Sequence, residues 1–546
     1  MDAVTTPPTA VNEPGDTFAP GSPARAELRT AIQEVASASL ELHHFIGGEH
    51  VAGDGTPFDV VQPHKTASVL GTGREATKAE ATAAVQACRD AAHDWRAMDF
   101  DDRAAIFLRA ADLLSGPYRQ KINAATMLGQ SKSPYQAEID TCELADFWRY
   151  NVSNAREIYA DQPHSDKAEW NRLDYRPIEG FVYAITPFNF TSISGNLAAA
   201  PALMGTTAVW KPSATQAIAA HWTMKILEAA GLPPGVINLV YGPGPDISDV
   251  LLADPDFAGI HFTGSTAVFK HLWRTTGENL DVYKSYPRLV GETGGKDFVL
   301  AHPSAEPKIL TTALLRGAFD YQGQKCSAAS RAFIPKSVWA TIKDDFLGKV
   351  ESIQYGDVAD FRNFGGAVID DRAFAKLSGA IDRAKTTDGL SIGAGGKYDD
   401  SVGYFIDPTV LIGEDPGDDA FHTEYFGPLL SVHVYDDSTA SAFYDILTVV
   451  DHGSPYALTG SIIADDRAAV AKAQDRLRYT AGNFYINDKP SGAVVGHQPF
   501  GGARASGTDD KAGTKMNLLR WTAVRAIKET FVAATDHRYP HQEPDA

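Results

Sequence analysis

The feature that most constrains this sequence is a fourfold alternation of short apolar runs and longer helical patterns between residues 180 and 275. Strand–helix units of this length return each strand to the same sheet in parallel, through right-handed crossovers. We therefore expect a doubly wound α/β sheet in this part of the chain. The apolar runs are FVYAIT (181–186), TAVW (207–210), VINLVY (236–241) and GIHFT (259–263), with helices expected near 191–203, 215–230, 246–254 and 265–275.

Small and polar residues follow each of the four predicted strands. Ligands of doubly wound sheets bind beyond the carboxyl ends of the strands, so these junctions are expected to share one rim. Residues 180–210 carry no charge, but their prolines and asparagines fit a buried strand–helix–strand run better than a membrane span. The four junctions are 186–189, 211–213, 242–245 and 263–265.

The regions on either side of this sheet are also patterned. Residues 1–24 are rich in Pro, Thr and Gly and are expected to form a flexible arm. A second α/β stretch is expected to begin near Arg288. Helices are predicted at 26–39, 77–97, 101–115, 118–159, 306–320 and 337–353, and strands near 288–292, 297–300, 328–335 and within 518–534.

Composition excludes several classes of protein. The chain carries 69 acidic and 49 basic residues, a formal net charge of −20, which disfavours nucleic acid and anionic membrane surfaces as partners. Three cysteines cannot form a disulfide scaffold, and Met1–Pro23 lacks the features of a secretory signal. We therefore expect a cytoplasmic enzyme without a membrane partner.

Cys326 and Glu292 are candidate reactive residues. Cys326 lies in YQGQKCSAAS, where a neighbouring cation or backbone N–H groups can favour the nucleophilic thiolate; a buried, inert thiol is the alternative. Glu292 lies in LVGETGGK at a strand end, where a carboxylate can act as a general base toward water. An ion pair with Lys296 is its alternative.

Three further candidates lie on the predicted rim. Asn189 in TPFNF can donate from its amide to a developing oxyanion, or it can be an ordinary turn residue. Lys211 in VWKPS can bind ribose or phosphate, or it can be an ordinary exposed lysine. Gly264 and Ser265 open a helix whose N-terminus can hold a pyrophosphate, although the usual G-x-G-x-x-G is absent.

In this order and spacing, the candidates resemble the aldehyde dehydrogenase superfamily from about Phe45 to Val532. The closest resemblance within it is to the branch of Δ1-pyrroline-5-carboxylate dehydrogenases, carried by TPFNF, by Phe269 and by the long run from 483 to 513. The superfamily motifs are FNF (188–190), WKPS (210–213), FTGS (262–265), ETGGK (292–296), GQKCSA (323–328), EYFGP (424–428) and PFGG (499–502).

The resemblance implies an aldehyde-dehydrogenase-like α/β fold with a Rossmann-type cofactor domain, an α/β catalytic domain and a small β flap for oligomerisation. The expected domains are an arm at 1–24, a cofactor domain at 25–167 and 180–291, a catalytic domain at 292–505, and a flap and tail at 168–179 and 506–546.

The resemblance also implies the chemistry of an NAD-dependent dehydrogenase. Cys326 would attack the aldehyde of L-glutamate γ-semialdehyde, Asn189 would hold the oxyanion, and Glu292 would activate water to release L-glutamate. No metal is expected. The implied NAD-binding residues are Thr186, Phe188, Lys211, Ser213, Gly264, Ser265, Glu424 and Phe426, and the implied substrate-binding residues are Ser327, Gly492, Ala493 and Phe500.

Several alternatives stay open. Another semialdehyde or aliphatic aldehyde dehydrogenase, a Cys-dependent hydrolase and a non-catalytic member of the superfamily are the rival functions. Ala214 stands where many NAD-preferring relatives carry an acidic residue, which leaves the preference for NAD over NADP open. A homo-oligomer is expected, and a separate proline dehydrogenase is expected to supply the substrate.

Overall fold

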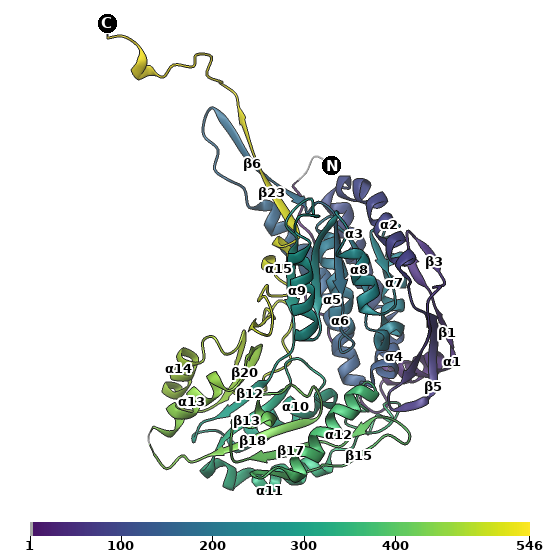
Figure 1. Cartoon of the computed structure of the whole chain (residues 1–546), viewed down its shortest axis with the longest axis vertical. Coiled ribbons are helices and arrows are strands. Elements are labelled where there is room, and N and C mark those ends of the chain that lie inside the picture. Colours follow the sequence, from purple (N-terminus) through teal and green to yellow (C-terminus); the bar gives the residue numbers. More distant parts are fainter. Residues whose placement is uncertain (1–3, 440, 546) are drawn as a thin grey trace.

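The structure, a computed structural model, describes residues 4–439 and 441–545. It consists of two α/β domains that meet along one edge and a two-stranded antiparallel ribbon that projects from the first domain (Figure 1). No helix of these residues is long and apolar enough to cross a membrane.

The first domain is built on a seven-stranded sheet of order β11-β10-β7-β8-β9-β2-β3. The first five strands run parallel, as the alternation of apolar runs and helices predicts. The hairpin of β2 and β3 continues the sheet antiparallel to β9. The strands are β2 (His44–Ile46), β3 (Glu49–Val51), β7 (Phe181–Ile185), β8 (Thr207–Lys211), β9 (Ile237–Leu239), β10 (Phe257–Thr263) and β11 (Arg288–Glu292).

Helices cover both faces of this sheet, because its strands are apolar on both sides. Val182 and Ala184 of β7 belong to the larger core on one face, whereas Phe181 and Tyr183 belong to the core on the other. The predicted stretch 118–159 is two helices, separated where Ser131 adopts a left-handed conformation with φ 57°. The helices are α1 (Pro23–Ser37), α2 (Lys78–Ala97), α3 (Phe100–Ser115), α4 (Arg119–Gln130), α5 (Pro134–Ala160), α6 (Thr191–Leu203), α7 (Ala217–Ala230), α8 (Gly244–Leu251) and α9 (Thr266–Glu278).

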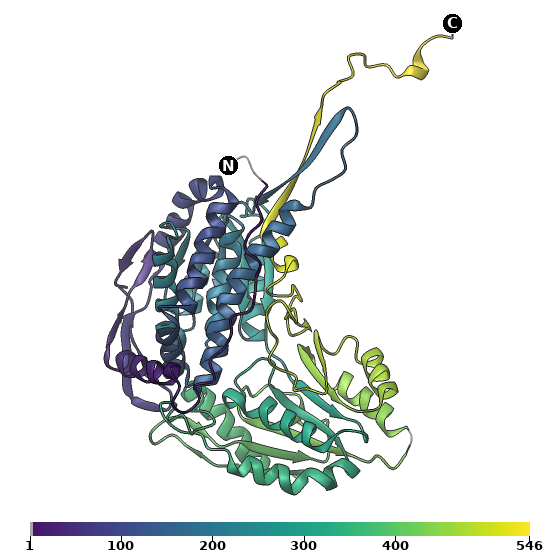
Figure 2. The ribbon, with the colours of Figure 1, turned by 180° about the vertical axis from the view of Figure 1, so that it is seen from behind.

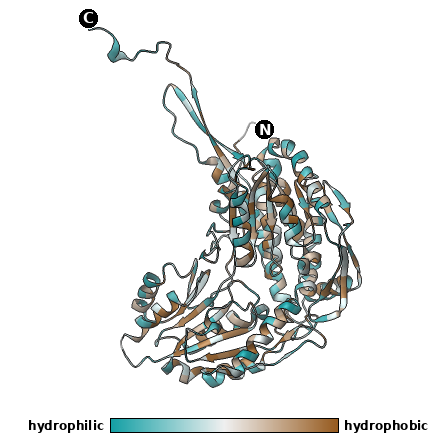
Figure 3. Cartoon of the chain, viewed as in Figure 1, coloured by the Kyte–Doolittle hydropathy of each residue, from teal (hydrophilic) through white to brown (hydrophobic). Residues whose placement is uncertain are grey.

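The second domain contains another seven-stranded sheet, of order β14-β17-β18-β13-β12-β20-β21, in which only β14 runs antiparallel to its neighbour. Its apolar strands lie between helices, as Figure 3 shows by the brown colour of the sheet. The elements are β12 (Asp297–Ala301), β13 (Ala329–Pro335), β14 (Leu390–Ala394), β17 (Thr409–Gly413), β18 (Leu429–Tyr435), β20 (Thr459–Ile463), β21 (Asn483–Ile486), α10 (Pro307–Phe319), α11 (Lys336–Ser352), α12 (Asp371–Thr386), α13 (Ala442–His452) and α14 (Arg467–Arg476).

The structure corrects the predicted start of the second α/β stretch. Arg288–Glu292 is the edge strand of the first sheet, where it pairs in parallel with all of Gly259–Thr263. The second sheet therefore starts at β12. Because β11 carries Glu292 at its carboxyl end, the first domain itself delivers this carboxylate to the seam between the two domains.

In the projecting ribbon, β6 (Glu169–Pro177) pairs with β23 (Thr522–Thr530), antiparallel over nine residue pairs (Figure 1). The ribbon takes up fewer residues than the predicted flap, because the chain before β23, including α15 (Lys515–Leu519), packs on the first domain. Leu518 and Trp521 are fully buried in the core of that domain.

The N-terminal arm is fixed to the body, which differs from the flexible arm predicted from its composition. Residues 4–19 form no helix or strand, but Phe18 is 4% exposed and packs in the core of the first domain. The Glu13 carboxylate bridges Arg119 of α4 and Arg149 of α5, at 2.7 Å from each. Side-chain contacts, which composition does not reveal, hold this segment in place.

Candidate active site

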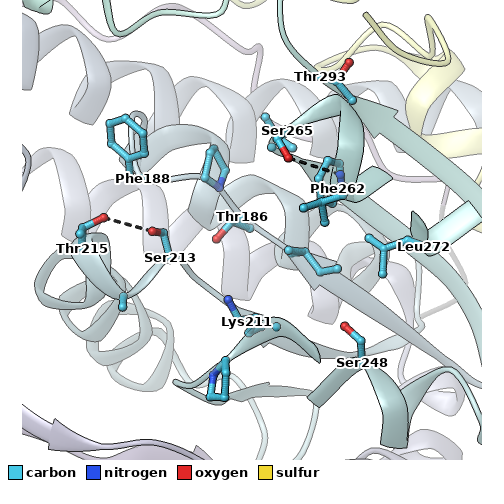
Figure 4. Close-up of a pocket in the computed structure, with 18 of the residues that line it drawn as sticks. Thr186, Phe188, Lys211, Ser213, Thr215, Ser248, Phe262, Ser265, Leu272 and Thr293 are labelled. Carbon is cyan, nitrogen blue, oxygen red and sulfur yellow. Dashed lines mark hydrogen bonds between the residues drawn. The ribbon is translucent and has the colours of Figure 1, made fainter. Parts of the chain in front are cut away.

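The four strand–helix junctions of the first sheet line one groove, with a cavity of about 970 Å³. It runs from the carboxyl ends of β7, β8, β9 and β10 toward the second domain, whose residues Cys326, Glu424 and Phe426 complete it. Figure 4 shows Thr186, Lys211, Ser213 and Ser265 around this space. The shared rim predicted from the sequence is thus present.

Ser265 caps α9 at the edge of the groove. Its Oγ accepts a hydrogen bond from the backbone N–H of Val268 at 3.3 Å, so the helix begins directly after Ser265 (Figure 4). The N-terminus of a helix presents unpaired N–H groups and a positive end of the helix dipole. The groove therefore offers a place for a phosphate group at this junction.

Lys211 lies at the end of β8 and is largely buried in the groove, unlike an ordinary exposed lysine. Burial lowers its pKa to about 8, and the Glu75 carboxylate partly opposes that shift. Glu75 and Ala214 line the same groove. Glu75 was not among the residues predicted from the sequence, because it precedes α2 and lies far from the other groove residues in the chain.

Other predicted groove residues make hydrogen bonds or ring contacts that hold the sides of the groove in place. The Thr186 hydroxyl lies 2.7 Å from Ser194 Oγ and accepts from the Trp210 indole at 3.0 Å, so it anchors the end of β7. The Ser213 hydroxyl lies 3.1 Å from that of Thr215 (Figure 4). Phe188 packs edge-on against Phe426 of the second domain, with ring centroids 5.8 Å apart, where the groove meets the catalytic side.

Cys326 is half-buried at the inner end of the groove, between η2 (Asp320–Gly323) and β13. Burial raises the pKa of its thiol well above the usual value, and the carboxylates of Asp297, Glu292 and Glu424 raise it further, against one hydrogen bond from the Ser327 backbone. The neighbouring Lys325 is itself buried, 4.0 Å from Asp320. The resting thiol therefore holds its proton firmly.

Asn189 is 3% exposed and faces the segment that carries the thiol. Its Nδ2 donates to the carbonyl of Gln324 at 3.0 Å. An amide nitrogen has two N–H groups, so one donor remains. The backbone N–H of Cys326 has no hydrogen-bond acceptor among residues 4–439 and 441–545. Two donors are thus available next to the thiol.

A buried ion pair positions Asn189. Asp140 accepts from the backbone N–H groups of Thr191 and Ser192, at 2.9 and 2.8 Å, and so holds the first turn of α6. Lys132 lies 2.7 Å from Asp140, and both side chains are 0–1% exposed. The Lys132 ammonium also lies 4.6 Å from the ring centroid of Tyr321, on the segment before Cys326. One charge pair therefore ties Asn189 to the thiol segment.

Glu292 is half-buried and lacks a partner for one oxygen. Its Oε2 accepts no hydrogen bond within the described chain, and burial raises its pKa well above the usual value. A Cβ on Gly501 would lie 2.9 Å from its Oε1, so the glycine keeps space beside this carboxylate. The alternative ion pair is absent, because Lys296 contacts the ring of Tyr425 instead, with Nζ 5.0 Å from the centroid.

Glu424 completes the groove from the second domain. Its Oε1 accepts from the backbone N–H of Gly295 at 2.8 Å, and a Cβ on Gly294 would collide with its carboxylate. The segment between Glu292 and β12 therefore runs directly beside Glu424. Burial raises the pKa of Glu424, and nearby Lys376 and Lys296 partly offset that effect.

The residues predicted to bind the substrate lie outside the groove, in two other segments. Ser327 follows the thiol, whereas Gly492, Ala493 and Phe500 belong to the loop that follows β21. Neither Gly492 nor Ala493 has an acceptor for its backbone N–H among the described residues. The loop returns at Phe500, which forms a bridge with Ala512 next to Gly501 and Glu292.

The part of the chain that the structure describes contains no group of three or more His, Cys, Asp or Glu side chains arranged to hold a metal ion. The carboxylates within electrostatic reach of Cys326 are those of Asp297, Glu292 and Glu424. Asp297 accepts a hydrogen bond from the backbone N–H of Thr459 through its Oδ1 at 2.8 Å, while its Oδ2 has no hydrogen-bond partner among the described residues.

Comparison with known proteins identifies the family. The profile described as "Aldehyde dehydrogenase family" matches residues 50–527. A protein of Dictyostelium discoideum named "Delta-1-pyrroline-5-carboxylate dehydrogenase, mitochondrial" is 46% identical over 98% of this chain and 96% of its own, and the Homo sapiens protein of that name is 44% identical over 97% and 94%. The crystal structure of the Mycobacterium tuberculosis Delta-pyrroline-5-carboxylate dehydrogenase bound with NAD superposes with a TM-score of 0.96, at 63% identity and full coverage of both chains. This chain belongs to the aldehyde dehydrogenase family.

Proposed function

We propose that this protein oxidises L-glutamate γ-semialdehyde, the open form of Δ1-pyrroline-5-carboxylate, to L-glutamate with NAD. The observation that carries the proposal is the convergence of Cys326, Asn189 and Glu292 at the inner end of the groove. Relatives that are 43–46% identical over nearly the whole chain bear the name of this activity. The product would be the end product of proline degradation.

The groove fits NAD in size and in its donors. We assign Thr186, Lys211 and Ser213 to the adenosine half, since they line the carboxyl ends of β7 and β8. Phe188, whose ring packs against that of Phe426, is assigned to the nicotinamide half. Gly264 and Ser265 at the start of α9 suit the pyrophosphate. Glu424 and Phe426 line the end nearest to Cys326 and are assigned to the nicotinamide half. When bound, NAD supplies the acceptor for the hydride of the aldehyde carbon.

Cys326 is the proposed nucleophile. Its sulfur forms a bond to the aldehyde carbon, and the carbonyl oxygen becomes an oxyanion. The free N–H of the Asn189 amide and the backbone N–H of Cys326 are the donors assigned to that oxyanion. Because burial holds the proton on the thiol, attack requires that this proton leave the sulfur first.

Glu292 is the proposed base for the second half of the reaction. Once the aldehyde hydrogen has left as hydride, Cys326 carries a thioester. Glu292 then takes a proton from water, whose oxygen adds to the thioester carbon, and the C–S bond breaks to release the carboxylate and the thiol. Its raised pKa brings it closer to that of a base that works near neutral pH.

The loop after β21 is the proposed site for the amino-acid end of the substrate. The unpaired N–H groups of Gly492 and Ala493 suit an α-carboxylate, as does the nearby hydroxyl of Ser327. Phe500 is assigned to the aliphatic part of the substrate. A protein of net charge −20 can thus bind an anion through local dipoles.

A steady-state assay tests this function. The purified protein is mixed with Δ1-pyrroline-5-carboxylate and NAD, and NADH absorbance is followed, with propionaldehyde and glutaric semialdehyde as competing substrates. We expect the highest kcat/KM with Δ1-pyrroline-5-carboxylate. A preference for propionaldehyde, or ester hydrolysis without NAD and no NADH formation, would instead favour one of the rival functions.

The assembly and the domain roles are also part of the proposal. We assign the cofactor role to residues 25–167 and 180–291, the catalytic role to 292–505, and oligomerisation to the two-stranded ribbon within 168–179 and 506–546. The ribbon extends far from the body, and its Trp170 and Val524 side chains are 50% and 46% exposed. Light scattering of the intact protein and of a Val524→Asp variant tests whether the ribbon holds a homo-oligomer together.

The cytoplasm is the proposed compartment, because the thiol of Cys326 must stay reduced. Several eukaryotic relatives carry the word mitochondrial in their names, which makes cell fractionation the necessary test. We propose that a separate proline dehydrogenase supplies the substrate. Coupled assays with that enzyme would detect transfer without release.

A further inference from the structure

The N-terminal arm follows α5 in the antiparallel direction and is bound to it at successive turns. Thr5 lies beside Arg156 near the C-terminal end of α5, at 2.7 Å, and the backbone N–H of Asp16 donates to Glu138 near its start, at 2.8 Å. Figure 2 shows the dark purple arm crossing the blue helices on its way to α1. The arm thereby brings N-terminal residues into contact with residues that are more than 100 positions away in the sequence.

Asn12, in the middle of the arm, uses its whole side-chain amide. Its Nδ2 donates to Asp146 Oδ2 and to the backbone carbonyl of Val495, both at 2.8 Å. Its Oδ1 accepts from the hydroxyl of Tyr150 at 3.0 Å. Asn12 therefore links α5 to the loop that follows β21, across nearly the whole length of the chain.

The loop end at Val495 rests on the same helix. A turn, closed by hydrogen bonds from the backbone N–H groups of His497 and Gln498 to the carbonyl of Val494 at 2.9 and 3.0 Å, places Gly496 against Tyr150. A Cβ on Gly496, which has φ 81°, would lie 2.4 Å from the Tyr150 ring. Val495 itself is 7% exposed. The carbonyl that Asn12 holds is thus part of a tightly seated turn.

In the sequence, this turn lies between two segments that adjoin the reactive residues Cys326 and Glu292. Before the loop, Tyr485 of β21 is within electrostatic reach of Cys326. After the loop, Gly501 adjoins the carboxylate of Glu292. Gly492 and Ala493, with their unpaired N–H groups, are two and three residues from Val495. A shift of the Val495 carbonyl would move those N–H groups relative to the thiol.

The arm is held firmly enough to position a loop. The Glu13 carboxylate next to Asn12 is 14% exposed and pairs with two arginines, and the backbone N–H of Glu13 donates to Asp146 Oδ1 at 2.7 Å. Asp146 therefore receives both the Asn12 side chain and the Glu13 backbone. The two residues form one clamp on α5.

We propose that Asn12 is a positioning residue that sets the affinity for the amino-acid end of the substrate. It fixes the Val495 carbonyl, and through it the N–H groups of Gly492 and Ala493 that face the substrate α-carboxylate. This inference rests on the proposed function, because it takes this loop as the binding site of that carboxylate. The N-terminal arm thus becomes a part of the specificity site.

Asn12→Ala tests the proposal through the two kinetic constants. Losing one hydrogen bond to the loop is expected to raise KM for Δ1-pyrroline-5-carboxylate about tenfold, with kcat within about twofold. Propionaldehyde has no amino-acid end, so its kcat/KM is expected to stay within about twofold of the wild type. A purely structural defect would lower the activity toward both aldehydes.

Two further variants complete the experiment. Thr5→Ala is the matched control, because it breaks contacts of the arm with Asp101 and Arg156 far from the loop, and KM is expected to stay unchanged. Tyr150→Phe keeps the ring under Gly496 and removes only the hydrogen bond to Asn12; it carries the test if Asn12→Ala does not fold, with KM raised about threefold.

The possible outcomes separate the two proposals. An unchanged KM for Δ1-pyrroline-5-carboxylate in both Asn12→Ala and Tyr150→Phe, or an equal loss of activity toward both aldehydes, would overturn the role of Asn12. Failure of the wild-type protein to form NADH from Δ1-pyrroline-5-carboxylate would overturn the proposed function instead.

Discussion

The groove and the thiol site differ in how the fold makes them. The first-domain side of the groove comes mainly from one sheet, at the carboxyl ends of four neighbouring parallel strands, so a single topological rule brings those residues together. The thiol site is made at the seam of two sheets. Glu292 ends an edge strand of the first sheet, whereas Cys326 precedes β13 of the second.

The two regions also differ in their electrostatics. In the groove, Lys211 is a half-buried cation with one acidic neighbour in electrostatic reach, Glu75. At the seam, burial raises the pKa values of Cys326, Glu292 and Asp297, and the two carboxylates raise that of the Cys326 thiol further. Strongly perturbed groups concentrate where chemistry is proposed, while the groove supplies binding. The following changes are expected to affect one region and spare the other.

Cys326→Ala is expected to give the largest effect. Without the thiol no covalent intermediate forms, so NADH formation is expected to fall by about 10³-fold or more, while NAD still binds within about twofold of the wild-type Kd. Steady-state assays and fluorescence titration measure the two quantities. Cys88→Ala is the control, because that thiol is buried in the core with a pKa raised to about 12. Substantial residual turnover in Cys326→Ala would remove the thiol from the mechanism.

Glu292→Gln is expected to slow turnover by about 10²- to 10³-fold, because it removes the base that activates water. A pre-steady-state burst of NADH is expected to survive better than the steady-state rate, since hydrolysis of the thioester is the step most affected. Stopped-flow absorbance measures both phases. Equal losses in burst and steady state would show that Glu292 acts before the thioester forms.

Asp140→Asn is expected to destabilise the folded protein at the seam between the two domains. It leaves Lys132 buried without a counterion, which costs about 3–5 kcal/mol of folding free energy, measured by denaturant unfolding. The matched change Asp345→Asn removes an exposed partner of Lys349 and is expected to cost less than about 0.5 kcal/mol. Similar losses in the two variants would argue against a role for the buried pair.

Binding of NAD is expected to weaken as the pH rises through about 8. Lys211 is protonated below its pKa of about 8 and loses its charge above it, so its donation to the cofactor weakens in alkaline solution. Titration at several pH values is expected to show Kd rising about three- to tenfold between pH 7 and 9.5. Lys211→Met should bind NAD weakly with little pH dependence; an unchanged pH profile in that variant would contradict the assignment.

Glu75→Gln is expected to have the smallest effect, on cofactor choice. The Glu75 carboxylate lines the groove beside Lys211, where Ala214 leaves no acidic residue, and it would repel the additional phosphate of NADP. The Kd for NADP is expected to fall about three- to tenfold in this variant, with the Kd for NAD changed by less. Parallel titrations with the two cofactors decide the point, and equal changes for both would argue against discrimination by Glu75.

Much of the groove was predictable because its residues follow local patterns. Thr186, Lys211 and Ser265 each stand within two residues of the end of an apolar run, and parallel topology places such residues together. Glu75 was not predicted because it follows β5 (Lys65–Arg74), a strand of a separate small sheet, and only the tertiary structure brings it to the groove.

Other features of the molecule depended on long-range packing. The sequence around Arg288 predicts a strand but not the sheet to which it belongs, because both sheets accept apolar parallel strands. Composition predicted a flexible arm, since Pro and Gly weaken helices and strands, yet Glu13 finds two arginines on helices more than 100 residues away.

The sequence by itself determined the fourfold strand–helix alternation, the four-junction rim, and the motifs that carry the resemblance to aldehyde dehydrogenases, because periodicity and turn chemistry are local properties. The tertiary structure alone decided which charges share the seam with Cys326, how Asp140 and Lys132 hold the first turn of α6, and that Asn12 reaches Val495. Those contacts join segments that are distant in the chain, and burial, which sets their electrostatics, arises only when the segments pack together.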